Sequence, residues 1–442
     1  MGGPGWPRVA VIGGGPGGAQ CARRLAEAGC PVTVFEPRTR FEKACGGGVP
    51  ARGIERFPFL RDAHLPGKEI RQCLVISPSG REARFPLDDP LFVFGRADLH
   101  ALMLERATAS GARLVRERVI SFRRATGGRD PGAGRDRWIL RSAGTETDPF
   151  DFLVAADGAS GGTRRRLVTG ARREDVSQGL GYYVPRVSED FITLKFYDGL
   201  HGYLWVFPRP DHSSAGICAT LGALPAADLR KLMDDFLRVR YPRRALDHAE
   251  RYAALIPGAP REPRAVPVQG EGWALLGDAA RFVDPLTREG IYYAMLSGDL
   301  LADALLRRRP EDYTEAWSRA CAPELSWAAG HGGRFFDTRF IERLVALCAG
   351  SPAVARVLSD LIAGKQSYRT LKRRLLLSAP RVGLQLLSRA LARRRGRTVR
   401  KGAPITPARG SRSTDCSADD SCRAAAFQRG HGIRDSDRGR TQ

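Results

Sequence analysis

Apolar residues near the start of the chain follow a strand, helix, strand order. The run Val9-Ala10-Val11-Ile12 is wholly apolar, which is typical of a parallel strand that is buried on both faces. Residues 17–27 have helical spacing, and Gly29 suits the cap that ends such a helix. Residues 31–36 include β-branched and aromatic side chains that favour a second strand. The first forty residues are therefore predicted to form a βαβ unit.

The rest of the chain changes between strand and helix patterns in blocks. We expect strands within 70–95 around a turn at 78–80, a helix over 96–110, a buried strand at 152–156, a sheet-rich segment over 180–220, a strand at 273–276 and helices over 290–306 and 311–392. Strands that alternate with helices predict an α/β protein, and the long sheet-rich middle predicts a second sheet.

Composition narrows the class of protein. The chain has 442 residues, of which 43% are hydrophobic, so it can form a sizeable core and is not a disordered or fibrous protein. Its net charge of +23 suits a nucleic acid, an anionic membrane surface or an acidic ligand. The nine cysteines form no Cys-x-x-Cys pair, which favours reduced thiols in the cytoplasm. We find no signal peptide and no apolar run of the roughly 18 residues that a transmembrane helix needs. We therefore expect a cytoplasmic protein that is soluble or peripheral on a membrane.

A glycine-rich loop joins the first predicted strand to the helix. Gly13, Gly15 and Gly18 have the spacing G-x-G-x-x-G: the first allows a tight turn, the second the approach of a pyrophosphate, and the third close packing of the helix on the strand. The helix N-terminus adds free N–H groups and the positive end of the helix dipole. Glu36, at the end of the second strand, is placed to bind ribose hydroxyls. The loop predicts a dinucleotide site, and by itself it does not distinguish NAD from FAD.

A second loop lies far along the chain. Gly277-Asp278-Ala279-Ala280 follows a buried strand, and a helix is predicted to begin near Gly290. In a flavoprotein such a Gly-Asp pair closes over the ribityl chain and the pyrophosphate, and the helix N-terminus at Gly290 and Ile291 could face the flavin ring. An ordinary strand-to-helix loop has the same pattern, so only the other motifs can show whether this loop binds a flavin.

Five motifs together resemble one known family. They are the glycine loop with Glu36, KACGGGVP at 43–50, RADL at 96–99, GYLWVFP at 202–208, and residues 277–291. Over about residues 8–375 the chain resembles the geranylgeranyl reductase family of FAD-dependent oxidoreductases, whose fold is similar to that of aromatic hydroxylases. The Tyr-x-Trp-x-Phe-Pro run is its most specific piece and is intact here. Arg288 stands where relatives often have glycine.

The resemblance implies a fold and a domain plan. The fold is α/β, with a Rossmann-type FAD-binding domain, an inserted antiparallel β-sheet substrate domain and a helical C-terminal region. The FAD-binding domain would comprise 6–165 and 266–306, the substrate domain 166–265 with strands from about 66–95, and the helical region 307–392. Residues 393–442 are Arg-, Ser- and Gly-rich, and we expect a basic disordered tail there.

The resemblance also implies site residues. The expected FAD contacts are Gly13, Gly15, Gly17, Gly18, Glu36, Cys45, Gly46, Gly48, Arg96, Val119, Asp157, Asp278, Gly290 and Ile291. Cys45 is in addition the candidate catalytic residue, since its thiol could relay a proton; it could equally pack on the flavin ring as a small hydrophobe. Tyr203 and Trp205 would line a prenyl tunnel, and the alternative for both is ordinary sheet core.

The activity implied by the family is reduction of C=C bonds in a geranylgeranyl-type prenyl lipid, by hydride transfer from reduced FAD and proton donation by a nearby acid or water. The electron donor would be NADPH, ferredoxin or a quinol. Two alternatives use the same fold: an FAD-dependent monooxygenase of the aromatic-hydroxylase type, and a non-catalytic prenyl-lipid carrier. Intact FAD-loop residues argue against the carrier.

One motif competes with this interpretation. Gly158-Ala159-Ser160-Gly161-Gly162 matches G-x-S-x-G, the nucleophile elbow of serine hydrolases, and histidines occur downstream. A hydrolase would leave the glycine loop, the aromatic run and Asp278 unexplained, so we do not favour it.

The basic C-terminal region also has alternative interpretations. Leucines at 375–377 alternate with basic residues at 372–374, a pattern that suits a helix lying on an anionic bilayer and equally a helix packed on the body. The Arg-rich tail has no interleaved aromatic residues, which disfavours a nucleic-acid partner. Cys416 and Cys422 lack partners for a metal site.

Overall fold

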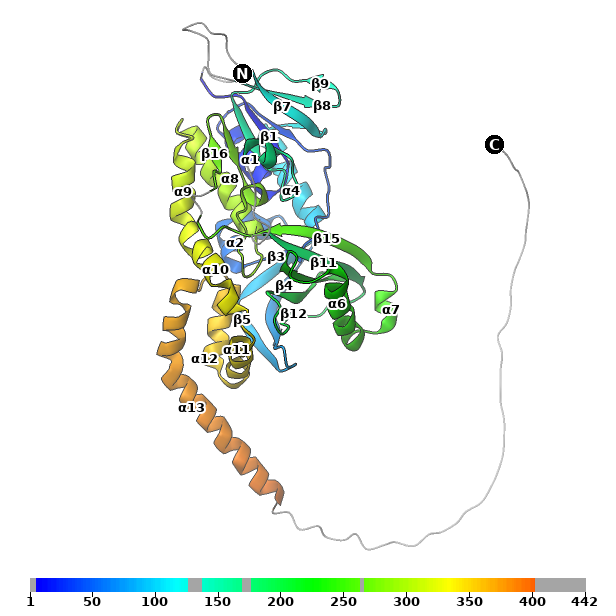
Figure 1. Ribbon diagram of the computed structural model, residues 1–442, viewed down its shortest axis with the longest axis vertical. Helices are drawn as coiled ribbons and strands as arrows, with labels where there is room; N and C mark the ends of the chain where they lie inside the picture. The colour runs from blue at the N-terminus through cyan, green and yellow to red at the C-terminus, as the bar shows by residue number, and fades with distance from the viewer. Residues whose placement is uncertain (1–4, 126–136, 169–175, 263–265, 402–442) are drawn as a thin grey trace, which may run out of the picture. The chain divides into compact units, whose positions relative to one another are not determined.

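A computed structural model describes residues 5–125, 137–168, 176–262 and 266–401 (Figure 1). The chain divides into two compact units, Met1–Ala390 and Leu391–Gln442. The first unit contains the three described β-sheets and the cavity between the two larger ones, and the following paragraphs describe it.

The first sheet has six strands and carries the predicted βαβ unit. In spatial order its strands are β16 (Gln269–Gly270), β17 (Trp273–Leu275), β10 (Phe152–Ala155), β1 (Val9–Ile12), β2 (Val32–Phe35) and β6 (Arg113–Val115). All pairs are parallel except β16 with β17. Strands β1 and β10 are wholly buried, as their apolar sequences predict. The carboxyl ends of these parallel strands form one edge, where α/β sheets bind ligands.

Three helices cover this sheet and fix its loops. Helix α1 (Pro16–Glu27) packs between α4 (Arg96–Ala109) and α8 (Ile291–Leu306). Gly298 lets α8 approach closely, because a Cβ there would lie 2.5 Å from the Gly17 carbonyl oxygen. A separate three-stranded sheet, β7 (Val119–Ala125), β8 (Arg137–Ser142) and β9 (Thr145–Glu146), forms a side layer.

The second sheet has eight strands. In spatial order they are β15 (Glu250–Pro257), β11 (Val176–Pro185), β14 (His212–Thr220), β13 (Gly202–Pro208), β12 (Ile192–Lys195), β4 (Gly67–Ile76), β5 (Glu82–Phe94) and β3 (Gly48–Val49). The sheet is predicted to be antiparallel, and one pair departs from that: β12 runs parallel to β4. The two strands come from distant segments, and a parallel pair requires such a long connection.

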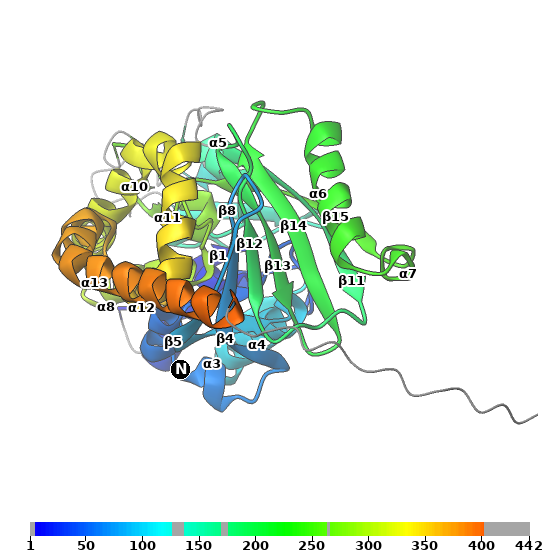
Figure 2. The ribbon, with the colours of Figure 1, turned by 90° about the horizontal axis from the view of Figure 1, so that it is seen from below.

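Helices pack on this sheet in two groups (Figure 2). Helix α6 (Ala226–Arg240) lies beside β11 and β14, where its Leu229 and Met233 form a core with Leu204 and Val206 of β13; the short α7 (Arg243–Leu246) follows it. Helices α11 (Thr338–Gly350) and α12 (Pro352–Ile362) pack on β5. Leu204 and Val206 face α6, so the alternate residues of β13 face the other side of the sheet.

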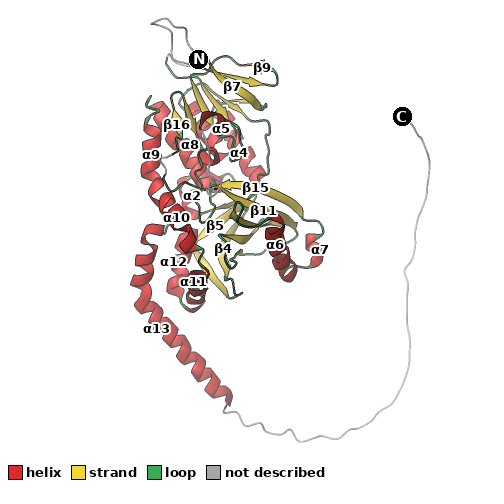
Figure 3. Cartoon of the chain, viewed as in Figure 1, coloured by secondary structure: helices red, strands yellow, loops and turns green. Residues whose placement is uncertain are grey.

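The remaining helices fill the connections, and the C-terminal third of the described chain is helical (Figure 3). They are α2 (Ala51–Arg56), α3 (Phe59–Asp62), α5 (Thr163–Leu167), the 3₁₀ turn η3 (Gly277–Ala280), α9 (Asp312–Ala320), α10 (Ala322–Phe335) and α13 (Tyr368–Lys401). Within the described residues, no single helix is long and apolar enough to span a bilayer. The pair α11 and α12 meets that test only when taken together, and it is bent by 117°.

The predicted disordered tail is wrong at its start. Disorder is predicted from residue 393, whereas α13 continues to Lys401. The segment 393–401 is rich in arginine, a good helix former, and it extends a helix that has already formed. The rest of that prediction, 402–442, with Cys416 and Cys422, lies outside the described residues.

Candidate active site

A cavity of about 1390 Å³ connects the edge of the first sheet with the inner face of the second. One part of its wall is formed by the glycine loop and other polar loops. The other part is formed by apolar side chains of the second sheet and of helices α10 to α12. The same continuous space is therefore polar at one end and apolar at the other.

The three motif glycines have different neighbours. Gly13 has φ +102°, and a Cβ there would lie 2.3 Å from the Ala156 carbonyl oxygen; at Gly18 it would lie 2.1 Å from the Gly13 carbonyl oxygen. Both positions need glycine because the chain itself occupies the space. Gly15 is different, since a Cβ there would meet nothing within 4 Å and the residue lines the cavity. The space above Gly15 is thus open to a ligand.

The N-terminus of α1 faces the same space. Gly15 is its N-cap residue, no side chain caps it, and Pro16 stands at the first helical position, so the helix offers unsatisfied N–H groups. The buried carboxylate of Glu36 holds the loop, accepting hydrogen bonds from the N–H of Gly14 (2.9 Å) and of Arg38 (3.1 Å). This arrangement suits an anionic nucleotide with a ribose next to Glu36.

Buried polar atoms without protein partners surround this end of the cavity. Arg96 is 6% exposed, and its Nε has no hydrogen-bond partner among the described residues. The same holds for Nδ1 of His100 and Oδ1 of Asp157. Burial lowers the pKa of His100, although the carboxylate of Glu36 opposes the shift. Buried polar groups are normally paired, so these atoms and the open space at Gly15 fit a bound flavin nucleotide.

The loop at 43–50 needs glycines because the ring of Phe207 packs against it, a contact that the sequence does not indicate. A Cβ on Gly46 or Gly48 would lie 2.7 or 2.8 Å from the ring of Phe207, and Gly47 has φ +84°. Phe207, the last aromatic residue of the Tyr-x-Trp-x-Phe-Pro run, therefore packs directly on this loop. Cys45 lines the cavity, and its Sγ lies 3.3 Å from the N–H of Gly47, which donates to it.

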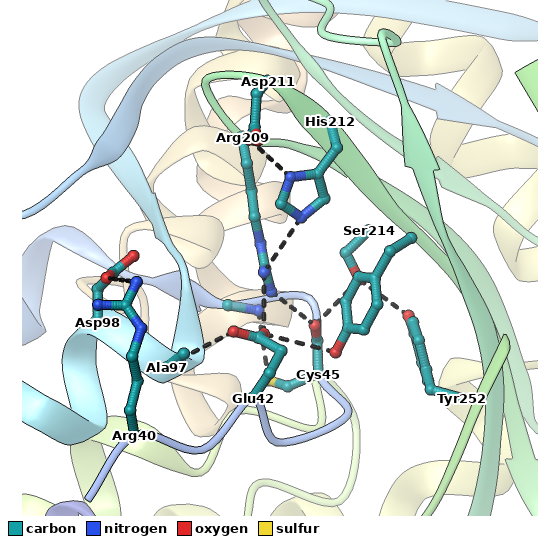
Figure 4. Close-up of polar contacts among 12 residues, drawn as sticks. Arg40, Glu42, Cys45, Ala97, Asp98, Arg209, Asp211, His212, Ser214 and Tyr252 are labelled. Atoms are coloured by element: carbon teal, nitrogen blue, oxygen red, sulfur yellow. Dashed lines mark hydrogen bonds and ion pairs between the residues drawn. The ribbon is translucent and has the colours of Figure 1, made fainter. Parts of the chain in front are cut away.

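A buried arginine connects the same loop to the second sheet (Figure 4). Arg209 is 2% exposed; it donates to Oε1 of Glu42 (2.9 Å) and to the carbonyl oxygen of Cys45 (3.3 Å). Ser214 donates to that carbonyl oxygen as well (3.0 Å). His212 lies 3.3 Å from Arg209 through Nε2. Arg209, directly after β13, and Ser214 of β14 thus hold the Cys45 loop by charged and neutral hydrogen bonds.

The second predicted loop lies on the opposite wall. Asp278 in η3 forms an ion pair with Lys43, so the loops at 43–50 and 277–280 contact each other across the cavity. Gly290 is the N-cap residue of α8, and a Cβ there would lie 3.1 Å from Val283 and 3.4 Å from Oδ1 of Asp278. Asp278, Gly290 and Ile291 all line the cavity.

Tyr203 and Trp205 are on the cavity face of β13. Both line the cavity, while Leu204 and Val206 between them form the core with α6. Their ring centroids are 6.1 Å apart, and Nε1 of Trp205 has no hydrogen-bond partner among the described residues. The Tyr203 hydroxyl donates to the carbonyl oxygen of Thr287. Both rings therefore border the cavity and do not belong to the core that β13 forms with α6.

The apolar end of the cavity extends from these rings between the second sheet and the helices. Its wall is made of aliphatic and aromatic side chains from three strands, the residue after β12, and three helices: Val75, Phe85, Leu91, Ile192, Leu194, Phe196, Phe335, Ile341, Leu344, Val345, Leu358, Leu361 and Ile362. A long apolar chain placed here would be removed from water along its length.

The structure separates one predicted residue from the others. Val119 does not line the cavity; it begins β7 in the side sheet, and its neighbour Arg118 lines the cavity instead. The other predicted site residues all line it: Gly13, Gly15, Gly17, Gly18, Glu36, Cys45, Gly46, Gly48, Arg96, Asp157, Tyr203, Trp205, Asp278, Gly290 and Ile291. Ser160 also lies on its wall, but no hydrogen bond joins it to a histidine among the described residues.

Several site residues were not identified from the sequence. They are Glu42, Lys43, His100 and Arg209. His100 could have been identified from the sequence, because it lies four residues after Arg96 on the same helix and so on the same face. The pairs Arg209–Glu42 and Lys43–Asp278 join residues 167 and 235 positions apart, and no local pattern indicates such contacts.

Fold and site together define a flavin-dependent oxidoreductase: a parallel sheet with a nucleotide loop, and a second sheet that encloses an apolar pocket. The model of the pyridine nucleotide-disulphide oxidoreductase family matches residues 7–74. Menaquinone reductase of Mycolicibacterium smegmatis is 31% identical over 333 residues, which cover 70% of this chain and 78% of the relative. Digeranylgeranylglycerophospholipid reductase 2 of Methanopyrus kandleri is 28% identical over 336 residues, or 70% and 79% of the two chains.

Solved structures share the fold. A geranylgeranyl bacteriochlorophyll reductase-like protein from Thermoplasma acidophilum superposes with a TM-score of 0.67 at 19% identity, over 84% of this chain and 98% of that chain. A flavin-dependent brominase gives a TM-score of 0.60 at 18% identity, over 85% and 100%. The chain belongs to the geranylgeranyl reductase family, as its motifs indicate.

Proposed function

We propose that the protein reduces C=C bonds of a geranylgeranyl-type prenyl lipid with FAD as its cofactor. The observation that carries this proposal is the continuity of the cavity, whose polar nucleotide end opens directly onto an apolar end lined by Tyr203 and Trp205. Relatives named as reductases of geranylgeranyl diphosphate, digeranylgeranylglycerophospholipid and menaquinone support the same class of substrate.

The residues at the polar end are proposed to hold FAD. The N–H groups at the start of α1 and the guanidinium of Arg96 would bind the pyrophosphate, and Glu36 the ribose hydroxyls. Asp278 and the start of α8 at Gly290 would contact the ribityl chain and the ring. Val119, which does not line the cavity, is the least supported of these contacts.

Reduced FAD supplies the hydride when it is bound. An isolated trialkyl alkene is a poor hydride acceptor. A proton must therefore add to the less substituted carbon of the double bond, so that positive charge develops on the tertiary carbon that accepts the hydride. We assign this proton relay to Cys45, whose thiol lines the cavity on a loop held by Arg209 and Ser214. The apolar wall excludes water and fixes the chain, which lowers the entropic cost of bringing the double bond to the reacting position.

The test is an anaerobic reaction of the purified, chemically reduced flavoprotein with geranylgeranyl diphosphate, followed by mass spectrometry. We expect products that have gained two hydrogens per reduced double bond. A product that has gained an oxygen atom under air would indicate a monooxygenase instead, and a colourless protein that binds lipid would indicate a carrier. Cys45→Ser should retain flavin and lose most product formation if the thiol relays the proton.

We propose that the electron donor is NADPH, ferredoxin or a quinol. Each of the three can be mixed anaerobically with the oxidised flavoprotein. The donor is the one that bleaches flavin absorbance at a rate at least equal to turnover.

We further propose that the protein is cytoplasmic and contacts an anionic membrane through α13. Leu376, Leu377 and Leu384 are 63%, 71% and 69% exposed, whereas Leu375 and Val382 of the same helix pack on the core. Exposed Lys372, Arg373 and Arg381 lie beside these leucines. Apolar side chains flanked by basic ones suit a helix in the interface of an anionic bilayer. Sedimentation with vesicles should require anionic lipid and should be abolished in L376S/L377S.

A further inference from the structure

The loop before α8 holds an arginine in a conformation that favours glycine. Arg288 has φ +60°. The loop around it is fixed by several hydrogen bonds: the N–H of Arg288 donates to the Asp284 carbonyl oxygen (2.9 Å), and Oδ1 of Asp284 accepts from the N–H of Leu286 (2.8 Å). A left-handed conformation is unfavourable for a residue that carries a Cβ. The surroundings impose this cost, which a glycine would avoid.

The side chain of Arg288 lies on the cavity wall beside the aromatic face of β13. Its positive charge acts on Cys218 and Tyr203: burial raises the pKa of both groups, and the Arg288 guanidinium opposes each shift. The guanidinium therefore lies close to the thiol of Cys218. Nε of Arg288 is buried and has no hydrogen-bond partner among the described residues.

Three other cations of the cavity wall are neutralised by carboxylates, whereas, among the described residues, Arg96 at the nucleotide end is not. Arg52 pairs with Glu289 (3.2 Å), and Arg209 with Glu42 (2.9 Å). Lys365 pairs with Glu55 and Asp89. Arg288 has no carboxylate within ion-pair distance in the described part of the chain, although it borders the apolar end of the cavity. A partly buried charge without a counter-ion is costly unless a ligand supplies one.

We propose that Arg288 is a specificity-determining residue that binds a phosphate oxygen in the head group of the prenyl substrate. A neutral carbonyl oxygen could accept a hydrogen bond from the guanidinium, but only an anion also neutralises the charge. The prenyl chain would extend from this point past Tyr203 into the apolar end. This inference rests on the proposed function, because it specifies the class of prenyl lipid that the same cavity accepts.

The test compares ligands that share one chain and differ in the head. Flavin-loaded wild-type protein, Arg288→Gly and Arg288→Lys are titrated with geranylgeranyl diphosphate, a geranylgeranyl ether of glycerol phosphate, and geranylgeraniol. Arg288→Gly suits the positive φ and should fold. Arg186→Gly is the matched control, since Arg186 also has a positive φ (+59°), is exposed and does not line the cavity.

Wild-type protein and Arg186→Gly should bind at least one of the two phosphorylated ligands roughly 10- to 100-fold more tightly than geranylgeraniol, and the preferred ligand identifies the source of the phosphate. Arg288→Gly should lose that preference with unchanged affinity for geranylgeraniol and an unchanged flavin reduction potential, and Arg288→Lys should retain part of it.

Two results would overturn the assignment. If Arg288→Gly keeps the preference for a phosphorylated ligand, or loses affinity for all three ligands equally, the assignment of Arg288 is wrong and the proposed function still stands. Failure of the wild-type flavoprotein to bind any of the three would overturn the proposed function together with this inference.

Discussion

The glycine loop allows a ligand-binding role to be separated from a folding role by two substitutions of the same size. A methyl group at Gly18 would collide with backbone, lying 2.1 Å from the Gly13 carbonyl oxygen and 2.9 Å from the Cβ of Ala156. A methyl group at Gly15 would enter open space, and the backbone of Gly15 (φ −65°, ψ 179°) is one that alanine adopts freely. Gly18→Ala should therefore impair folding, and Gly15→Ala should impair cofactor binding.

The expected magnitudes follow from these contacts. Forcing a methyl group into a packed site costs about 1–3 kcal/mol, so Gly18→Ala should lower the melting temperature of the apo-protein by about 1–4 °C. Gly15→Ala replaces one weak N-cap residue by another, which costs below about 1 kcal/mol. Its methyl group would block a phosphate from the backbone N–H groups. Loss of one charged hydrogen bond, about 1.5–3 kcal/mol, weakens binding roughly 10- to 100-fold.

Two measurements on flavin-stripped protein test this reasoning. Thermal denaturation of the apo-protein reports stability, and quenching of FAD fluorescence on titration reports affinity. Gly162→Ala serves as control, because Gly162 has an ordinary helical backbone, a Cβ there would meet nothing within 4 Å, and the residue does not line the cavity. It should change neither quantity by more than a small amount.

The reasoning fails if Gly15→Ala binds FAD with wild-type affinity, because the open space would then not be the place of the pyrophosphate. It also fails if Gly18→Ala is as stable as the wild-type apo-protein. A Gly15→Ala variant that loses stability and affinity to the same extent as Gly18→Ala would show that both glycines serve packing alone.

Three further predictions concern single side chains. Asp278→Ala should release FAD more readily on dilution than Cys45→Ala, since it removes a charged partner of Lys43 as well as the proposed ribityl contact; equal retention would contradict this. Trp205→Ala should change which double bonds are reduced and leave the flavin spectrum intact, because the ring borders the cavity; unchanged products with a much lower melting temperature would identify Trp205 as sheet core. Burial lowers the pKa of His100 below 6.5, so its neutral form stabilises the fold above that pH and stability is lost as the pH falls through the depressed value. Urea midpoints of His100→Gln should fall less between pH 7.5 and 5.5 than those of the wild type, and parallel slopes would count against this.

Much of the architecture could be predicted because it depends on local patterns. The apolar run at 9–12 and the spacing of Gly13, Gly15 and Gly18 indicate a strand, a tight turn and a helix within one short segment. The alternation of β13 predicts two faces, but it does not say which face meets α6 and which meets the cavity. That assignment depends on where a helix from 226–240 packs, and no sequence period contains this information.

The parts that could not be predicted are contacts between distant segments. Gly46 and Gly48 suggest close approach of a cofactor, whereas the ring of Phe207 occupies the space where their side chains would be. Arg209 is buried and paired with Glu42, and no motif of the sequence indicates that contact. The continuation of α13 to Lys401 depends on a helix that is already nucleated, so composition alone misjudged it.

The parallel pairing of β12 with β4 has a consequence for how the chain is synthesised. During synthesis β4 can pair with β5 as soon as both have been made, but its other edge stays unpaired until residues 192–195 of β12 follow. An open strand edge is a site for pairing with other chains. A nascent chain that stalls between β5 and β12, or a fragment ending near residue 165, would therefore expose an unpaired edge of β4 that is prone to aggregation. The complete chain buries that edge as soon as β12 arrives.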